Sequence, residues 1–333
     1  MDQTLPTSAN PGRVKLTQIS SLAWEHPADM AALNTLRALP GFDAVVRKVA
    51  GAIGERGIRH IFTANAVRIG PRQRPKLDAL WSEVLDTFDW PTRPQLYVTQ
   101  TPIVNAMAVG FDEPFVVVNS ATLRLLDRDE QRDVLAHELG HIISGHVTYS
   151  TLAILMITFG LRNLPFPAAI ALFPFELALL EWYRKAELSS DRAGLLGTQD
   201  LTRSMMVYFK LAGGSAGDDE ISLDEFLKQA AEYETTGNIW DSFLKLANTA
   251  TQNHPFATVR VAELQKWVAT GAYARIVGGD YPRRGGEAES DLRQDYAKAA
   301  DYYGDRARAA ISEVEGVIDR ARDAFASRFR GGK

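Results

Sequence analysis

Two histidines and one glutamate could do chemistry together near the middle of the chain. His137, Glu138 and His141 form an H-E-x-x-H pattern. Residues four apart lie above one another on one face of a helix, so both histidines can bind one metal ion through their imidazoles. Glu138 then points to the side of that ion, where a water molecule would bind. Zinc suits this arrangement, because it lowers the pKa of bound water to about 7 and the glutamate can take the proton during attack on a peptide carbonyl.

The residues around this pattern predict a buried helix. Asp127 and Glu130 have the spacing of a capping box, which marks a helix start. The apolar residues that follow would bury most of the helix: Val134, Leu135, Leu139, Ile142, Ile143 and Val147. Buried histidines and a buried glutamate need partners, because burying them unpaired is costly. This favours a metal site over a solvated helix that carries two histidines and a glutamate.

A catalytic zinc site needs a third protein ligand, and Glu187 is the candidate. Glu187 and Asp191 lie four residues apart in a second helical stretch, so they share a face. Glu187 could bind zinc while Asp191 accepts a hydrogen bond from the far nitrogen of a ligand histidine. The alternative is an exposed charged helix in which these acids pair with Arg184 and Lys185.

Five stretches then follow one another in an order that is typical of a known family. They are Asn105–Ala108, Phe115–Ser120, His137–His141, Glu187–Asp191, and His254-Pro255 followed by Arg260. Together they resemble the M48 family of zinc metallopeptidases, the group of the HtpX heat-shock protease and the CAAX prenyl protease. The resemblance covers about residues 90–268. Ser190 departs from it, because the family more often has alanine there, and the N-terminal membrane spans of HtpX have no evident counterpart, so an HtpX-like topology is not expected.

The resemblance implies a fold and a cofactor. The fold would be α+β and mostly helical, with a zincin-like (gluzincin) catalytic core, a small mixed sheet, an N-terminal helical support and a long C-terminal helix. One zinc ion per chain would be held by His137, His141 and Glu187. Glu138 would act as general base and then donate to the leaving amine, and Asp191 would orient a ligand histidine.

Further roles also follow from the resemblance. An edge strand that pairs with the backbone of a protein or peptide substrate is expected at Asn105, Ala106, Met107 and Ala108. A plain core strand is the alternative there. His254 would hydrogen-bond the oxyanion or bind zinc in a resting state, and its alternative is a structural His-Pro turn. Arg260 is expected to pair with a buried carboxylate rather than to touch substrate.

The composition limits the classes of protein to consider. The 333 residues are 46% hydrophobic, which is enough for a buried core. The net charge of −4 does not show the basic excess that is typical of proteins that bind nucleic acid. The absence of cysteine fits a reducing compartment and excludes disulfides and cysteine metal sites. Residues 1–13 are polar and lack the apolar run of a signal peptide, which favours a cytoplasmic location. Association of the chain with the inner face of the membrane is compatible with this location.

Breaks in the pattern divide the chain into five parts. They are a flexible lead (1–25), an N-terminal helical region (26–90), a catalytic domain (91–270), a linker (271–287) and a C-terminal helix (288–333). Short strands are expected at 95–99, 104–109 and 115–118. Apolar residues at 4-3 spacing over 288–330 predict coiled-coil packing, on the same chain or with a second one.

The apolar stretch 147–180 inside the catalytic domain allows three interpretations. Neither half reaches the ~20 apolar residues that span a bilayer, and Arg162 and three prolines interrupt it. A hydrophobic hairpin, packed in the protein or lining the substrate cleft, is favoured over shallow insertion into a membrane face. A true span is the least favoured, because the arginine and the prolines would need special burial.

The resemblance implies hydrolysis of internal peptide bonds in unfolded or damaged proteins. One rival is a non-enzymatic client-binding or scaffold protein that uses 147–180 and the C-terminal helix. The other rival is an integral membrane protease. All the residues that zinc chemistry needs are present, which counts against the scaffold.

Overall fold

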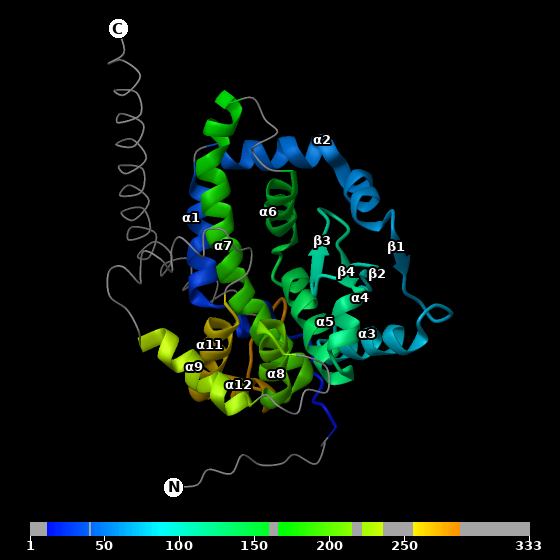
Figure 1. Ribbon diagram of the computed structural model, residues 1–333, viewed down its shortest axis with the longest axis vertical. Coiled ribbons are helices and arrows are strands. Elements are labelled where there is room, and N and C mark those ends of the chain that lie inside the picture. Colours follow the sequence, from blue (N-terminus) through cyan, green and yellow to red (C-terminus); the bar gives the residue numbers. More distant parts are fainter. Residues whose placement is uncertain (1–11, 40, 160–165, 215–221, 236–255, 287–333) are drawn as a thin grey trace.

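A four-stranded mixed sheet lies among helices in the computed structural model, which describes residues 12–39, 41–159, 166–214, 222–235 and 256–286 (Figure 1). The strands are β1 (Ala66–Arg68), β2 (Gln95–Thr99), β3 (Ala106–Val109) and β4 (Phe115–Asn119). Their order is β1-β2-β4-β3, in which β2 and β4 are parallel and the two outer strands run antiparallel to their neighbours. The expected α+β class with a small mixed sheet is confirmed, and the three expected strands form.

Helices make up most of the remaining described chain. In chain order they are the 3-10 turn η1 (Ser21–Ala23), α1 (Pro27–Ala38), α2 (Phe42–Thr63), α3 (Pro75–Thr87), α4 (Ser120–Leu125), α5 (Arg128–Ile143), α6 (Val147–Phe159), α7 (Phe166–Thr198), α8 (Leu201–Ala212), α9 (Leu223–Thr235), α11 (Ala257–Ala269) and α12 (Ala272–Val277). α5 packs most extensively against α7, and it also contacts α3, α8 and β3. It is therefore the central helix of the fold.

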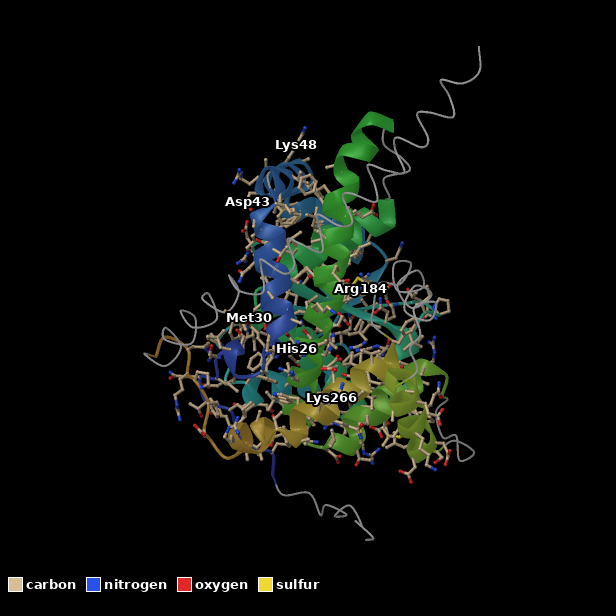
Figure 2. The ribbon with its side chains drawn as sticks, turned by 90° about the vertical axis from the view of Figure 1, so that its left-hand side faces the viewer. His26, Met30, Asp43, Lys48, Arg184 and Lys266 are labelled. Atoms are coloured by element: carbon tan, nitrogen blue, oxygen red, sulfur yellow. The ribbon has the colours of Figure 1, made fainter. Side chains whose placement is uncertain are left out.

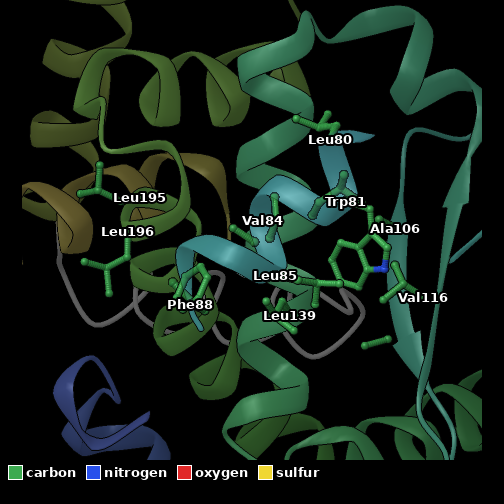
Figure 3. Packing of buried hydrophobic residues seen from close by; sticks show 14 of the residues in the cluster. Leu80, Trp81, Val84, Leu85, Phe88, Ala106, Val116, Leu139, Leu195 and Leu196 are labelled. Carbon is green, nitrogen blue, oxygen red and sulfur yellow. The ribbon is translucent and has the colours of Figure 1, made fainter. Parts of the chain in front are cut away.

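Side chains point alternately to the two faces of the sheet along each strand, and helices bury both faces. Val116 of β4 belongs to one apolar cluster with Trp81 of α3 and Leu139 of α5 (Figure 3). Val117, the next residue, belongs to another cluster with Ile58 of α2. Helices α3 and α5 thus cover one face, and α2 and α6 cover the other.

The start of α5 is fixed by its first turn. The Asp127 side chain accepts hydrogen bonds from the backbone N–H groups of Asp129 and Glu130, and the Glu130 carboxylate accepts from the Asp127 N–H at 2.8 Å. The expected capping box is therefore confirmed. Because the cap sets where the helix begins, it also sets which face of α5 carries each later residue.

The N-terminal region is helical as expected, apart from one strand. α1 begins at Pro27, and α2 follows the turn at Gly41 and bends at Gly54, where φ is +66°. The interpretation of 26–90 as wholly helical misses β1, which pairs with β2. Three residues are too few to show an alternating pattern. Pairing with β2, rather than local sequence, determines that this segment is a strand.

Two segments that we expected to be flexible or linking are packed instead. Leu16, Ile19 and Trp24, in the lead assigned to 1–25, are fully buried. The linker assigned to 271–287 contains α12, and its later residues bond to the lead: Ser20 N–H donates to Pro282 O at 2.9 Å. Polar and glycine-rich composition predicted flexibility, but these backbone groups find partners far along the chain.

Within the apolar stretch 147–180, the described residues form α6 and the first half of α7. Leu152 and Leu155 of α6 and Leu179 of α7 are buried within the protein, where α6 packs against α7. Helix α1 lies along α7, as two perpendicular views agree (Figures 1 and 2). In the part of the chain that the structure describes, no helix combines the length and the apolar character that crossing a membrane requires.

Three predictions fall on residues outside the described ranges. They are the site role of His254, the long C-terminal helix over 288–333 and its coiled-coil packing over 288–330. These stay predictions, as do the outer boundaries of the five parts.

Candidate metal centre

Helix α5 presents the three residues of the H-E-x-x-H pattern from a buried position. His137, Glu138 and His141 are 7%, 5% and 4% exposed. The spacing of four residues brings the two imidazoles together, with ring centroids 4.9 Å apart. Both rings turn Nε2 toward the same point, since only 3.2 Å separates the two Nε2 atoms.

Small residues let α7 approach α5 closely. A Cβ atom built at Gly197 would lie 2.2 Å from Cβ of Ala136, and one at Gly140 would lie 2.6 Å from Cβ of Ala193. Ordinary van der Waals contacts begin at 3.4 Å. The backbones of the two helices therefore lie close together. This close packing places Glu187 of α7 beside the two histidines.

His137, His141 and Glu187 form a buried group that could hold a metal ion. His141 Nε2 lies 3.1 Å from Glu187 Oε1, and His137 Nε2 lies 3.6 Å from Glu187 Oε2. Ligand atoms about 2.0–2.1 Å from zinc at tetrahedral angles would stand about 3.3 Å from one another. The donor set and its spacing fit zinc and leave a fourth position for water. The structure thus brings together the three residues that the sequence indicated as metal ligands.

Asp191 and Arg260 lie behind the ligands. Asp191 Oδ1 is 3.1 Å from His137 Nδ1, where it can accept that nitrogen's hydrogen and leave Nε2 free to bind metal. Arg260 donates from Nε to Asp191 Oδ2 at 2.9 Å and from Nη2 to Oδ1, and its Nη2 lies 3.4 Å from Glu187 Oε2. Burial alone would raise the pKa of Asp191, but Arg260 lowers it, so this carboxyl is ionised. Arg260 pairs with buried carboxylates, as we expected.

Neighbouring charges make the two imidazoles differ before a metal binds. Burial acts to lower the pKa of His137, but Glu187 and Asp191 raise it to about 10. Burial lowers the pKa of His141 to about 4 and outweighs its hydrogen bond to Glu187. A metal ion must therefore displace the proton of His137, so metal binding competes with protonation.

A cavity of about 760 Å³ lies beside the ligands. Glu138 and Glu187 line it, and so do Asn105 and Ala106 at the start of β3. The rest of its wall mixes polar residues, among them Asp133, Gln229 and Arg260, with apolar ones such as Val207 and Phe226. A molecule in this cavity would lie between the sheet edge and Glu138, which suits a carboxylate that acts on a bound reactant.

Strand β3 lies at one edge of the sheet in the described residues, where the substrate-pairing stretch was expected. Asn105 O accepts hydrogen bonds from the Asn119 N–H at 2.9 Å and from Thr122 Oγ1 at 2.7 Å, which fixes the start of the strand. The Asn105 side chain accepts from the Ala106 N–H at 2.9 Å. Ala106 and Ala108 are buried, and Met107 is half-buried. Pairing of this strand with a substrate stays a prediction.

Two buried residues next to His141 were not predicted from the sequence. His146 Nδ1 lies 3.3 Å from His141 Nδ1, and Asp29 Oδ2 lies 3.1 Å from His146 Nε2. A third histidine shortly after the motif was a usable signal for His146. No spacing rule links Asp29 to the motif, because α1 reaches the site only through tertiary packing.

Asp133, one helical turn before His137, was not predicted from the sequence either. Asp133 is buried and accepts hydrogen bonds from Thr198 Oγ1 at 2.8 Å and from Ser204 Oγ. Burial raises the pKa of Asp133 to about 6 against these two hydrogen bonds. Its carboxyl joins α5 to the end of α7 and the start of α8.

Comparisons with known proteins bear on the same residues. The model of peptidase family M48 matches residues 71–268, which include His137, His141 and Glu187. The plastoglobule-localized metallopeptidase 48 of Arabidopsis thaliana is 32% identical over 260 residues, which are 76% of this chain and 74% of that protein. A protease HtpX homolog of Helicobacter pylori (strain Shi470) is 24% identical over 198 residues, 52% of this chain and 64% of the relative. A second, from strain J99, is 39% identical over 69 residues, 20% of this chain and 22% of the relative. No solved structure gives a significant match.

Proposed function

Since this chain belongs to peptidase family M48 and is a metalloprotease, we propose that it is a zinc-dependent endopeptidase with a zincin-like (gluzincin) core. One observation carries the proposal: two imidazoles and a distant carboxylate converge at the wall of a cavity that Glu138 also lines. The substrates would be unfolded or damaged proteins cut at internal bonds, as part of protein quality control.

Each residue's part in the reaction follows from its place. His137, His141 and Glu187 would hold one zinc ion, which would supply a water of lowered pKa and polarise the substrate carbonyl. Glu138, at the cavity wall, would accept the proton of the attacking water and then donate it to the leaving amine. Asp191 would keep the hydrogen of His137 on Nδ1.

The substrate would bind along the edge of β3. An extended peptide beside Asn105–Ala108 would add a strand to the sheet and place its scissile bond in the cavity. His254 would hydrogen-bond the oxyanion. That role is supported by its sequence position, two residues before Phe256, which lines the cavity.

The proposal also includes a location. The absence of cysteine supports a reducing compartment, so the chain would act in the cytoplasm, with peripheral contact to the inner face of the membrane through 147–180. Extraction of membranes with carbonate tests this contact: release of the chain supports it, and retention would instead support an integral membrane protease. Self-association through 288–330 would appear as a larger mass in sedimentation, lost when that segment is removed.

Casein cleavage with and without zinc tests the proposed function. The zinc-loaded protein should cleave casein, a chelator should stop cleavage, and zinc should restore it. Glu138→Gln should keep the zinc and lose about 100- to 10,000-fold in rate, the usual contribution of a general base. Glu181→Gln, which changes a half-exposed acid of α7 paired with Arg184, is the matched control and should cleave at the parental rate.

The same assay separates the enzyme from a scaffold. A scaffold would bind casein without cutting it, with or without zinc. Cleavage by Glu138→Gln at the parental rate would show that another group is the base.

A further inference from the structure

A buried chain of polar groups leads away from His141, on the Nδ1 side of its ring. His141 Nδ1 lies 3.3 Å from His146 Nδ1, and His146 Nε2 lies 3.1 Å from Asp29 Oδ2. His146 and Asp29 are 2% and 1% exposed. The proposed reaction uses neither residue. Burying an imidazole and a carboxylate is nevertheless costly unless they are paired with each other or with other polar groups.

The positions of the hydrogens follow from the chemistry at both ends of this chain. A metal on Nε2 of His141 leaves the hydrogen of that neutral ring on Nδ1, which must then donate. The Asp29 carboxylate only accepts, so it requires the hydrogen of His146 on Nε2. The Nδ1–H of His141 needs an acceptor, so His146 must be neutral in the zinc-bound protein, with a lone pair on Nδ1, the atom that faces His141 Nδ1. One consistent set of donors and acceptors therefore runs from Asp29 to the metal ligand.

Asp29 is itself held firmly by α7. Its Oδ1 accepts from Trp182 Nε1 at 2.9 Å, and its Oδ2 accepts from Ser189 Oγ at 2.6 Å. Burial raises the pKa of Asp29, but His146 and Ser189 more than offset this, and the pKa is lowered. Trp182 and Ser189 flank Glu187 on α7, so the carboxylate of α1 is fixed to the same helix that supplies the third ligand.

We propose that Asp29 and His146 are positioning residues that hold His141 with its Nε2 toward zinc. Asp191 contacts His137 in the corresponding way, so each ligand histidine has its far nitrogen bound. Helix α1, which lies along α7 (Figure 2), thereby becomes part of the metal site rather than a remote support. This inference rests on the proposed function, because it assumes that the three ligands bind zinc.

Zinc affinity, measured by competition with a chromophoric chelator, tests the proposal. Asp29→Asn keeps the size of the side chain and removes its charge, and it should weaken zinc binding about 10- to 100-fold, as loss of a hydrogen-bonding partner of a metal ligand does. Asp78→Asn is the matched control, because it makes the same change at a carboxylate of α3 that pairs with Arg93 and contacts neither Asp29 nor His146. It should bind zinc as the wild type does.

Two spectroscopic readouts separate positioning from a general loss of structure. Cobalt substituted for zinc should show shifted visible absorption bands in Asp29→Asn and unshifted bands in Asp78→Asn. Nitrogen-15 NMR of the histidines in the zinc-loaded wild type needs no variant. It should find the hydrogen of His141 on Nδ1 and that of His146 on Nε2.

The outcomes distinguish the inference from the function beneath it. A wild type that binds no zinc would overturn both. A wild type that binds zinc, together with an Asp29→Asn that binds it equally well with an unchanged cobalt spectrum, would overturn the inference alone. A His146 that carries its hydrogen on Nδ1 in the zinc-loaded protein would do the same, even if Asp29→Asn fails to fold.

Discussion

The contact between α5 and α7 makes a quantitative prediction at Gly197. In Gly197→Ala, the new Cβ would start 2.2 Å from Cβ of Ala136 and must move to at least 3.4 Å, so the helices must part by about 1.2 Å. The ring of Phe88 lies 3.4 Å from the same Cβ position and leaves no further room there. Overpacking of this kind costs about 1–3 kcal/mol. Zinc ligand distances tolerate only about 0.2 Å, so even half of this displacement at Glu187 would weaken zinc binding.

Urea unfolding of the metal-free protein and a zinc titration measure the two effects. The unfolding midpoint of Gly197→Ala should fall, and its zinc affinity should fall as well. Gly51→Ala is the matched control, because Gly51 lies in α2 with nothing within 4 Å of its Cβ position, and alanine there should stabilise the helix by up to about 1 kcal/mol. If Gly197→Ala unfolds and binds zinc as the wild type does, close packing does not position Glu187.

Three further predictions concern charge and metal. The folded-state pKa of Asp133, about 6, lies above its unfolded value of 3.8, so its stabilising contribution is complete below pH 3.8 and is lost as pH rises through 6. The unfolding free energy of Asp133→Asn relative to wild type should therefore rise by up to about 3 kcal/mol between pH 4 and 7, and a constant difference in urea unfolding would contradict this. Arg260→Met leaves buried carboxylates without their cation and should cost about 3–5 kcal/mol in the same assay, whereas Arg93→Met, at an exposed pair with Asp78, should cost under about 1 kcal/mol; equal costs would refute the distinction. Zinc at 100 times its dissociation constant should raise the unfolding free energy by about 2.7 kcal/mol, and an unmoved midpoint would argue against binding to the folded state.

Local rules predicted the centre of this molecule well. The four-residue spacing of His137 and His141 placed both imidazoles on one face of α5, and the Asp127–Glu130 capping box located the start of that helix. Strands β2, β3 and β4 were also predicted, because their alternation or apolar runs are visible in the sequence. In each case the relevant partners lie within a few residues of one another.

Long-range packing explains what the sequence did not predict. Asp29 reaches His146 because α1 lies along α7, and no pattern near either residue signals that contact. Leu16 is buried although both its neighbours in the chain are polar, since the segment inserts into a core built by distant helices. The strand β1 exists because β2 offers a hydrogen-bonding edge. These features depend on the assembled fold rather than on local composition.

X-ray absorption at the zinc edge of the zinc-loaded wild type tests the central claim most directly, because it reports the atoms bound to the metal. The account predicts a first shell of nitrogen and oxygen atoms at about 2.0–2.1 Å with the scattering signature of two imidazoles, from His137 and His141. A shell of oxygen atoms alone, without imidazole scattering, would contradict it.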